Sequence, residues 1–239
     1  MSDVFYAFSA GRSGTTSLAT YLSYAKNARI FHEPSGGMSP FLKGYVENQK
    51  LGHPFTQKEL FEGFRKDAID SVLATGKTYG ELSPMLSYLA EGMIDNYPDA
   101  KVIWCLRDPK KWIRSAMHVN FRNGVFEDTC AMWYDLMVHI SNGYWKAKEE
   151  NRCIIKMDRM TPEERFNLYK WLDLEPTHDG AWEWMNRTFN EHQYPGPIWA
   201  PHPDDWSRSD QEAYDHYVTP LLQEVLEAYP GEQRWTVHE

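Results

Sequence analysis

The sequence predicts an α/β fold in which a central parallel sheet of about five strands is flanked by helices. Five short apolar runs lie within the first two-thirds of the 239-residue chain, and segments with helical spacing lie between them. Strands that alternate with helices form right-handed crossover units, which place parallel strands in one sheet and helices on both of its faces. A chain of this length can bury a substantial core in such a domain.

The five predicted strands are bounded by turn or polar residues. They are residues 4–8 (VFYAF), 29–32 (RIFH), 78–82 (TYGEL), 101–106 (KVIWCL) and 153–157 (CIIKM). We therefore expect a single domain over residues 1–239, with the sheet core at about residues 1–160. C-terminal helices and a lid are expected at about residues 161–239.

Helical periodicity predicts seven helices between and after the strands. They cover about residues 15–26, 57–74, 85–96, 110–121, 129–149, 162–172 and 209–228. Thr56 is the expected N-cap of the second helix, and Gly76 closes its end. The last helix is expected to begin near Ser209, with Asp210 also available as a cap.

Two segments fit neither pattern. Residues 34–54 begin directly after a predicted strand, and residues 190–206 contain the proline-rich run YPGPIWAPHPDDW. The second segment is too long for a simple connection, so we expect it to form a lid or wall over a site.

Composition and charge exclude some classes of function. Acidic residues outnumber basic ones by 34 to 25, which gives a net charge of −9 and argues against non-specific nucleic-acid binding. The three cysteines are far apart, and two lie in apolar runs, so we expect reduced thiols in a cytoplasmic protein. No segment resembles a signal peptide or a membrane span, and we expect no membrane insertion.

The first predicted strand runs into the loop SAGRSGTTS, residues 9–17, and then into a helix. Its glycines, Gly11 and Gly14, permit a tight turn, and the amides that open a helix favour an anion. Arg12 adds a permanent charge, and Ser13, Thr15, Thr16 and Ser17 add hydroxyl groups. The lysine of a triphosphate-binding loop, GxxxxGK[ST], is missing, so the alternative is an ordinary capped glycine turn.

A second cationic segment, CLRDPKKWIRSAMH, follows the fourth predicted strand. Arg107 stands where that strand ends, Pro109 suits the first turn of the next helix, and Ser115 falls within its first two turns. Ligands of open α/β sheets bind at the carboxyl ends of the strands, so Arg107 and Ser115 are expected to reach an anion beside the first loop. The alternative is that Arg107 pairs with Asp108 or another surface carboxylate.

These two segments together resemble the PAPS-dependent sulfotransferase family. Arg12 stands where many cytosolic members have a lysine, and in this it is similar to the bacterial and carbohydrate branches rather than the cytosolic steroid and phenol branch. The resemblance implies a P-loop-like sulfotransferase fold, PAPS as the sulfuryl donor, PAP as the product and no metal. It assigns the 5′-phosphosulfate to Gly11, Arg12, Ser13, Gly14, Thr15, Thr16 and Ser17, and the 3′-phosphate to Arg107 and Ser115. Arg187 and its neighbours are candidates for the adenine and 3′-phosphate lid, because the RKG segment of the cytosolic branch is not evident.

The acceptor needs a base at the same sheet edge. The second strand ends in FHEP, where Glu33 resembles the base of some bacterial and carbohydrate members and His32 is the alternative, because its ordinary pKa is near neutrality. On the third strand, Glu81 is a second candidate base, or a group that orients Arg12. The structural alternative, equally open, is that Glu81 is an acidic residue that stabilises the N-terminus of the following helix.

We therefore expect transfer of a sulfuryl group from PAPS to a hydroxyl or amine of a small-molecule, carbohydrate or lipid-like acceptor. Aromatic segments at residues 34–60, 121–133 and 182–206 are expected to form its walls. The alternatives are a P-loop kinase or nucleotide phosphotransferase, which would need Mg²⁺ and a lysine-bearing loop, and a non-catalytic anion-binding module. The sequence does not fix the oligomeric state.

Overall fold

The computed structural model describes residues 3–33, 56–119, 124–157, 160–177 and 200–228. Its strands are β1 (Val4–Phe8), β2 (Ala28–His32), β3 (Thr78–Leu82), β4 (Lys101–Leu106) and β5 (Arg152–Lys156). Its α-helices are α1 (Thr15–Leu22), α3 (Gln57–Phe61), α4 (Asp67–Leu73), α5 (Ala90–Asn96), α6 (Pro109–His118), α7 (Phe126–Lys146), α8 (Pro162–Trp171), α10 (Arg208–Tyr217) and α11 (Thr219–Ala228). Shorter turns are the π-helical η1 (Glu62–Lys66) and the 3-10 segments η2 (Pro84–Leu89), η4 (Glu149–Asn151) and η6 (Pro203–Asp205).

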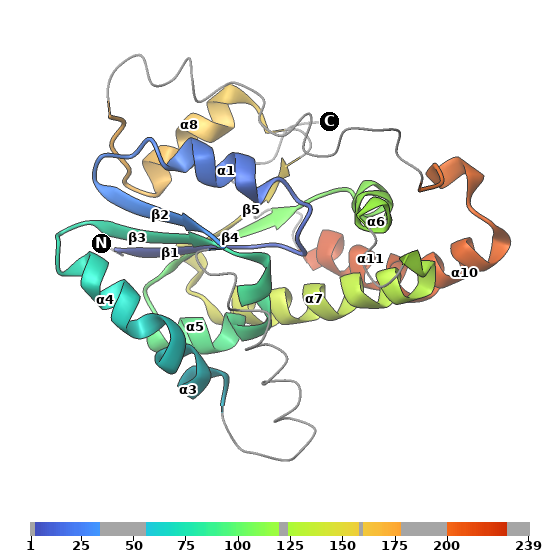
Figure 1. Cartoon of the computed structure of the whole chain (residues 1–239), viewed down its shortest axis with the longest axis horizontal. Coiled ribbons are helices and arrows are strands. Elements are labelled where there is room, and N and C mark those ends of the chain that lie inside the picture. The colour runs from blue at the N-terminus through green and yellow to red at the C-terminus, as the bar shows by residue number, and fades with distance from the viewer. Residues whose placement is uncertain (1–2, 34–55, 120–123, 158–159, 178–199, 229–239) are drawn as a thin grey trace.

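The five strands form one parallel sheet in the order β2-β3-β1-β4-β5, which confirms the predicted fold class. Helices α1 and α8 cover one face, and α4, α5 and α7 cover the other, with α10 and α11 on the side of α7 (Figure 1). The chain leaves β1 toward β3 and β2, whereas it leaves β4 toward β5. The carboxyl ends of β1 and β4 therefore meet where the direction of winding changes.

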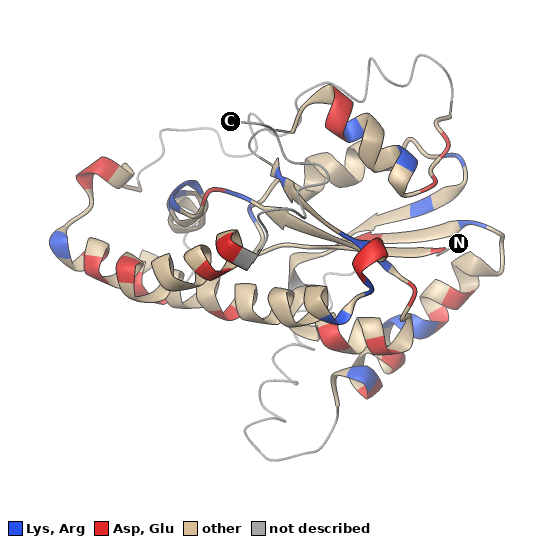
Figure 2. Ribbon diagram, turned by 180° about the vertical axis from the view of Figure 1, so that it is seen from behind, with Lys and Arg blue, Asp and Glu red and all other residues tan. Residues whose placement is uncertain are grey.

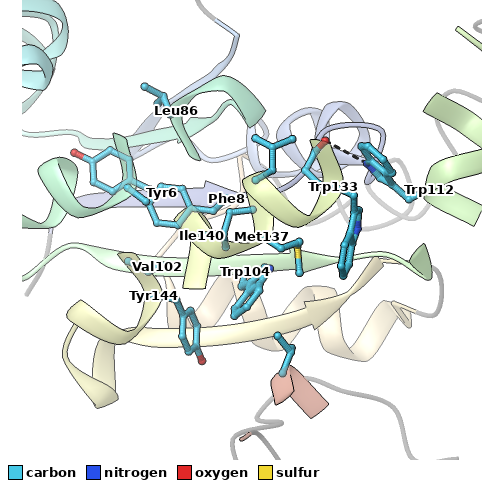
Figure 3. Packing of buried hydrophobic residues seen from close by; sticks show 14 of the residues in the cluster. Tyr6, Phe8, Leu86, Val102, Trp104, Trp112, Trp133, Met137, Ile140 and Tyr144 are labelled. Atoms are coloured by element: carbon cyan, nitrogen blue, oxygen red, sulfur yellow. Dashed lines mark hydrogen bonds between the residues drawn. The ribbon is translucent and has the colours of Figure 1, made fainter. Parts of the chain in front are cut away.

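Each face of the sheet buries its own apolar cluster because side chains alternate along every strand. Phe5, Ala7 and Cys105 pack with α1 and α8, whereas Tyr6, Phe8 and Trp104 pack with α5 and α7. Figure 3 shows aromatic rings from β1, β4, α6 and α7 meeting in the second cluster. All three cysteines are buried free thiols, as expected for their apolar surroundings.

Three predicted helices are shorter than expected or interrupted. The helix expected at residues 15–26 ends at Leu22, because the next residues pair with a distant segment through the bridge between Ala25 and Pro176. The helix expected at 57–74 contains the π-helical turn η1, in which Arg65 is buried. The helix expected at 85–96 starts as the 3-10 segment η2.

The C-terminal helix was predicted wrongly as one element. Ser207 is the N-cap of α10, and Asp210, three residues later, completes a capping box by accepting a hydrogen bond from the Ser207 amide. The N-cap is therefore neither Ser209 nor Asp210. The helix then breaks at Val218, because Pro220 lacks an amide hydrogen and its ring would clash with the carbonyl four residues earlier. Thr56 and Pro109 occupy the predicted positions at helix starts.

The remaining elements shift by a few residues. Strands β2 and β5 each begin one residue earlier than predicted, and α7 covers Phe126–Lys146 rather than 129–149. The predicted loose segment at 34–54, most of that at 190–206, and residues 120–121 of the fourth predicted helix lie outside the described residues.

Close helix packing on the α5 side depends on glycine. A Cβ on Gly92 would lie 2.4 Å from the main-chain carbonyl of Gln57, so α5 approaches α3 too closely for a side chain. Because backbone atoms rather than a flexible side chain would be displaced, we predict that Gly92→Ala lowers the free energy of unfolding by ~1–3 kcal/mol, measured by urea denaturation.

Gly63→Ala is the matched control for this substitution. Gly63 is also helical, but its added Cβ would meet nothing within 4 Å, so the change is expected to be neutral or stabilising by up to ~1 kcal/mol. Equal stability of the two variants would contradict the packing argument.

Candidate functional site

The carboxyl ends of β1 and β4 bring together the two cationic segments that the sequence singled out. The loop after β1 leads into α1, and the loop after β4 leads into α6. Ligands of open α/β sheets bind at such a change of winding direction. In Figure 2 the ribbon of α6 and of the segment that leads into it from β4 is marked by Lys and Arg positions.

The loop between β1 and α1 makes an unusually tight turn. Gly11 and Gly14 have φ of 77° and 79°, and Arg12, at 45°, also lies in the left-handed region. A non-glycine residue pays about 1–3 kcal/mol for this conformation, which clusters at ligand-binding sites. Such a turn, together with the first amides of a helix, is suited to binding an anion.

The hydroxyl groups of the loop divide into two sets. Ser13 is buried, and its hydroxyl donates to the Gly11 carbonyl over 2.8 Å, so this side chain stabilises the turn itself. Thr15 and Thr16 open α1, and both hydroxyls lie near the ring of His32. Ser17 follows them, half-buried, in the first turn of α1.

The segment after β4 contacts this loop directly. Arg107 donates from Nη1 to the Arg12 carbonyl over 2.5 Å, and Arg12 donates from Nε to the Ser115 hydroxyl over 3.1 Å. Asp108 caps α6 by accepting from the amides of the next turn, and Pro109 opens the helix. Three of the predicted anion-binding residues are therefore within one connected cluster.

His32 and Glu33 stand at the end of β2 beside the start of α1. The Nε2 atom of His32 lies 3.3 Å from the Thr15 hydroxyl and 3.2 Å from the Thr16 hydroxyl. Burial lowers the pKa of His32, although the neighbouring Glu33 carboxylate opposes the shift. Glu33 is exposed and has φ of 46°, so the strand ends at His32 and the alternation of faces does not extend to Glu33.

Glu81 occupies a different environment from Glu33. It is fully buried, and its carboxylate accepts from Arg65 Nε at 3.1 and 3.2 Å and from the hydroxyl of Tyr79. Burial raises the pKa of Glu81, while Arg65 and Tyr79 favour its charged form. The group thus joins η1 to β3 as a buried ion pair, an arrangement that suits a structural role better than that of a solvent-accessible base.

Sequence reasoning missed two contributors to the loop, Ser87 and Trp112. Ser87, on η2, accepts from the Ser9 amide over 3.3 Å and donates to the Ser9 carbonyl over 3.0 Å. Trp112 donates its indole N–H to the carbonyls of Gly11 and Ala10. The spacing of Trp112 and Ser115, three residues apart on one helix, places both on one face and is the signal that would have indicated Trp112.

Several predicted features lie outside the described residues. Arg187 and its neighbours are among them, as are residues 34–55 and 182–199 of the predicted acceptor walls. Of the predicted wall at 121–133, residues 124–133 are described, and they lie in and just before the start of α7. Within the described part of the chain, no group of three or more His, Cys, Asp or Glu side chains is arranged to hold a metal ion. No helix among the described residues is long and apolar enough to cross a bilayer.

Comparison with known proteins matches this chain to one protein family. A family profile described as a sulfotransferase domain matches residues 6–193. The search of curated proteins returns no match.

Similar solved structures share the fold. Sulfotransferase STF9 from Mycobacterium avium has a TM-score of 0.57 and 13% identity, covering 96% of this chain and 77% of that one. The sulfotransferase domain of the Synechococcus PCC 7002 olefin synthase has a TM-score of 0.52 and 14% identity, covering 91% and 88%. The sulfotransferase domain of the curacin biosynthetic pathway has a TM-score of 0.53 and 14% identity, covering 90% and 97%.

The buried pair of Arg65 and Glu81 leads to a stability prediction. Glu81→Gln leaves the Arg65 guanidinium buried without its counter-charge, so we expect the free energy of unfolding to fall by ~3–5 kcal/mol in urea denaturation.

Glu175→Gln is the control for charge removal at a glutamate. Glu175 pairs with Lys26 over 2.9 Å, but both side chains are 59% exposed, so its loss is expected to cost under ~1 kcal/mol. If Glu81→Gln costs no more than this control, the buried pair does not stabilise the fold.

Proposed function

Because the chain belongs to the sulfotransferase family, we propose that it transfers a sulfuryl group from PAPS to a hydroxyl or amine of a small-molecule acceptor. The observation that carries the proposal is the connected cluster of Arg12, Arg107 and Ser115 at the carboxyl ends of β1 and β4. Two fixed positive charges meet there in a chain whose net charge is −9, which is the arrangement that a donor with two phosphate groups requires.

The two halves of the cluster suit the two ends of the donor. The turn at residues 11–14 and the first amides of α1 would hold the 5′-phosphosulfate, with Arg12 beside it. Arg107 and Ser115 would hold the 3′-phosphate, and Arg187 remains a candidate for the lid. Each arginine offers a planar set of donors to phosphate oxygens.

Sulfuryl transfer by this site would follow an in-line displacement. The acceptor oxygen or nitrogen bonds to sulfur while the bond between sulfur and the bridging oxygen of the 5′-phosphate breaks, and that electron pair leaves with PAP. By analogy with phosphoryl transfer, the main demand is to position the groups and stabilise the negative charge that develops on the leaving phosphate. Arg12 and the loop amides would meet this demand.

Glu33 is the better candidate for the base that takes the acceptor proton. It is exposed at the end of β2, within one residue of His32, whose ring lies on the first turn of α1. The Nε2 atom of His32 is already engaged with two threonine hydroxyls, so this nitrogen would orient the loop hydroxyls. Glu81 is buried in its ion pair, which leaves Glu33 as the accessible carboxylate of the three candidates.

The acceptor is the second substrate of the proposed reaction. A hydroxyl or amine of a small-molecule, carbohydrate or lipid-like compound would approach between the loop and the end of β2. A carboxylate base at that position suits either nucleophile, because it can accept a proton from both.

The donor is tested by calorimetric titration with PAP and, separately, with ATP and Mg²⁺. We expect PAP to bind in the micromolar range, and Arg12→Ala and Arg107→Ala each to weaken binding ~10–100-fold, because each removes charge-assisted hydrogen bonds. Arg29→Ala, at an exposed position early in β2, is the control and should leave PAP affinity unchanged. A preference for ATP with Mg²⁺ would overturn the donor assignment in favour of a phosphotransferase.

The base is tested by steady-state kinetics with PAPS. Glu33→Gln should retain PAP affinity and lower turnover ~10²–10⁴-fold, because general-base catalysis contributes about that much. His32→Gln should have the smaller effect on turnover.

The pH profile distinguishes the alternative base. A histidine base acts only when neutral, and burial lowers the pKa of His32, so its activity would rise with pH over a window below the ordinary value of about 6.5. If Glu33→Gln keeps full turnover and His32→Gln loses the rise of activity with pH, then His32 rather than Glu33 is the base.

A further inference from the structure

The anion-binding loop is held by its carbonyl groups. Four consecutive carbonyls, those of residues 9–12, each accept a hydrogen bond from a side chain. The donors come from three separate elements: Ser87 of η2, Trp112 of α6, and Arg107 after β4. Ser13 also donates to the Gly11 carbonyl from within the loop.

Trp112 makes the central contact of this set. Its indole N–H lies 2.6 Å from the Gly11 carbonyl and 3.2 Å from the Ala10 carbonyl, so a single donor serves two successive peptide groups. The residue is fully buried within the apolar cluster of α5, α6 and α7 (Figure 3). A buried indole held by packing on all sides keeps its N–H in a fixed direction, which a surface side chain does not.

The direction of these carbonyls matters for anion binding. A carbonyl oxygen that faced the site would repel a phosphate or sulfate, and a loop of unpaired peptide groups would have to reorganise when the ligand arrives. Donors behind the loop favour the peptide orientation in which these carbonyls point to the protein, and the Gly11 amide is itself fixed by donating to the Ser9 hydroxyl over 3.1 Å. Such preorganisation is the usual source of strong electrostatic stabilisation in active sites.

The helix that carries Trp112 also carries Ser115, which accepts from Arg12 Nε. Residues three apart on a helix are neighbours on its surface, so both contacts come from one face of α6. The same helix begins directly after Arg107, whose guanidinium donates to the Arg12 carbonyl. Contacts from α6 and from the residue before it therefore connect the loop expected to hold the 5′-phosphate with the residues expected to hold the 3′-phosphate.

We infer that Trp112 is a positioning residue, which orients the peptide groups of Ala10 and Gly11 so that the loop binds the anionic end of the donor and stabilises its leaving phosphate. The inference rests on the proposed function for the identity of the donor, but the ordering of the loop by Trp112 is a property of the free protein. Trp112 itself need not touch the donor.

The test compares Trp112→Phe with Trp104→Phe. Both replace a fully buried tryptophan of the same apolar cluster by a smaller ring, but Trp104 packs against Tyr144 rather than donating to the loop. Urea denaturation measures the stability that each variant loses, and the loop is then followed by amide hydrogen exchange of residues 9–17 in the nucleotide-free protein.

We expect loop exchange to be faster in Trp112→Phe than in Trp104→Phe when both are corrected for global stability. PAP affinity should fall about tenfold, and kcat should fall while KM for the acceptor stays unchanged, because a neutral hydrogen bond contributes on this scale. Loop exchange or PAP affinity equal to that of Trp104→Phe would overturn the inference.

A second variant removes the donor without changing the shape. Benzothienylalanine at position 112 replaces the indole N–H by sulfur, so it decides the question even if Trp112→Phe does not fold. It should reproduce the loss of loop protection, and wild-type protection in this variant would overturn the inference. If wild-type protein does not bind PAP, the donor assignment fails, whereas loop exchange still decides the role of Trp112.

Discussion

The arrangement of this protein's site depends on one backbone constraint, the turn between β1 and α1. Three of its residues have positive φ, including Arg12, where a side chain makes this conformation costly. The turn persists because side chains from η2, α6 and the end of β4 hold its carbonyls from behind. Strain in the loop is thus offset by hydrogen bonds that form only when the sheet and its flanking helices are assembled.

The same constraint links folding to the candidate chemistry. Residues that stabilise the turn, such as Trp112 and Ser87, are buried and belong to the core, whereas Arg12 and Glu33 present charge at the edge of the sheet. The strand order places β1 and β4 side by side, so two cationic segments about a hundred residues apart become neighbours. The rigid sheet therefore fixes the spacing of the two groups that the proposed donor needs.

Much of the fold was accessible from the sequence because hydrophobic periodicity is a local property. All five strands were predicted within one residue, since each is a short apolar run between polar boundaries. The break between α10 and α11 was missed even though Pro220 signals it. The π-helical turn η1 was also missed; its buried residue Arg65 pairs with Glu81, a distant partner on β3. Local patterns carry no record of such a partner.

The site was predictable to the extent that its residues lie in short motifs. Arg12, Arg107 and Ser115 were grouped by their positions after strands, and the structure brings them together. Ser87 was not singled out, because a serine in a helix is an ordinary residue until the loop that it contacts is known. Trp112 was passed over although its spacing from Ser115 places both on one face of α6. The pairing of Glu81 with Arg65 likewise required the tertiary structure.

The most direct test of the account is a crystal structure of the protein with PAP bound. We predict the 5′-phosphate at the amides of residues 12–16 beside Arg12, the 3′-phosphate at Arg107 and Ser115, and the loop carbonyls still bonded to Ser87, Trp112 and Arg107. PAP bound away from the carboxyl ends of β1 and β4, or with its two phosphates exchanged between the segments, would contradict it.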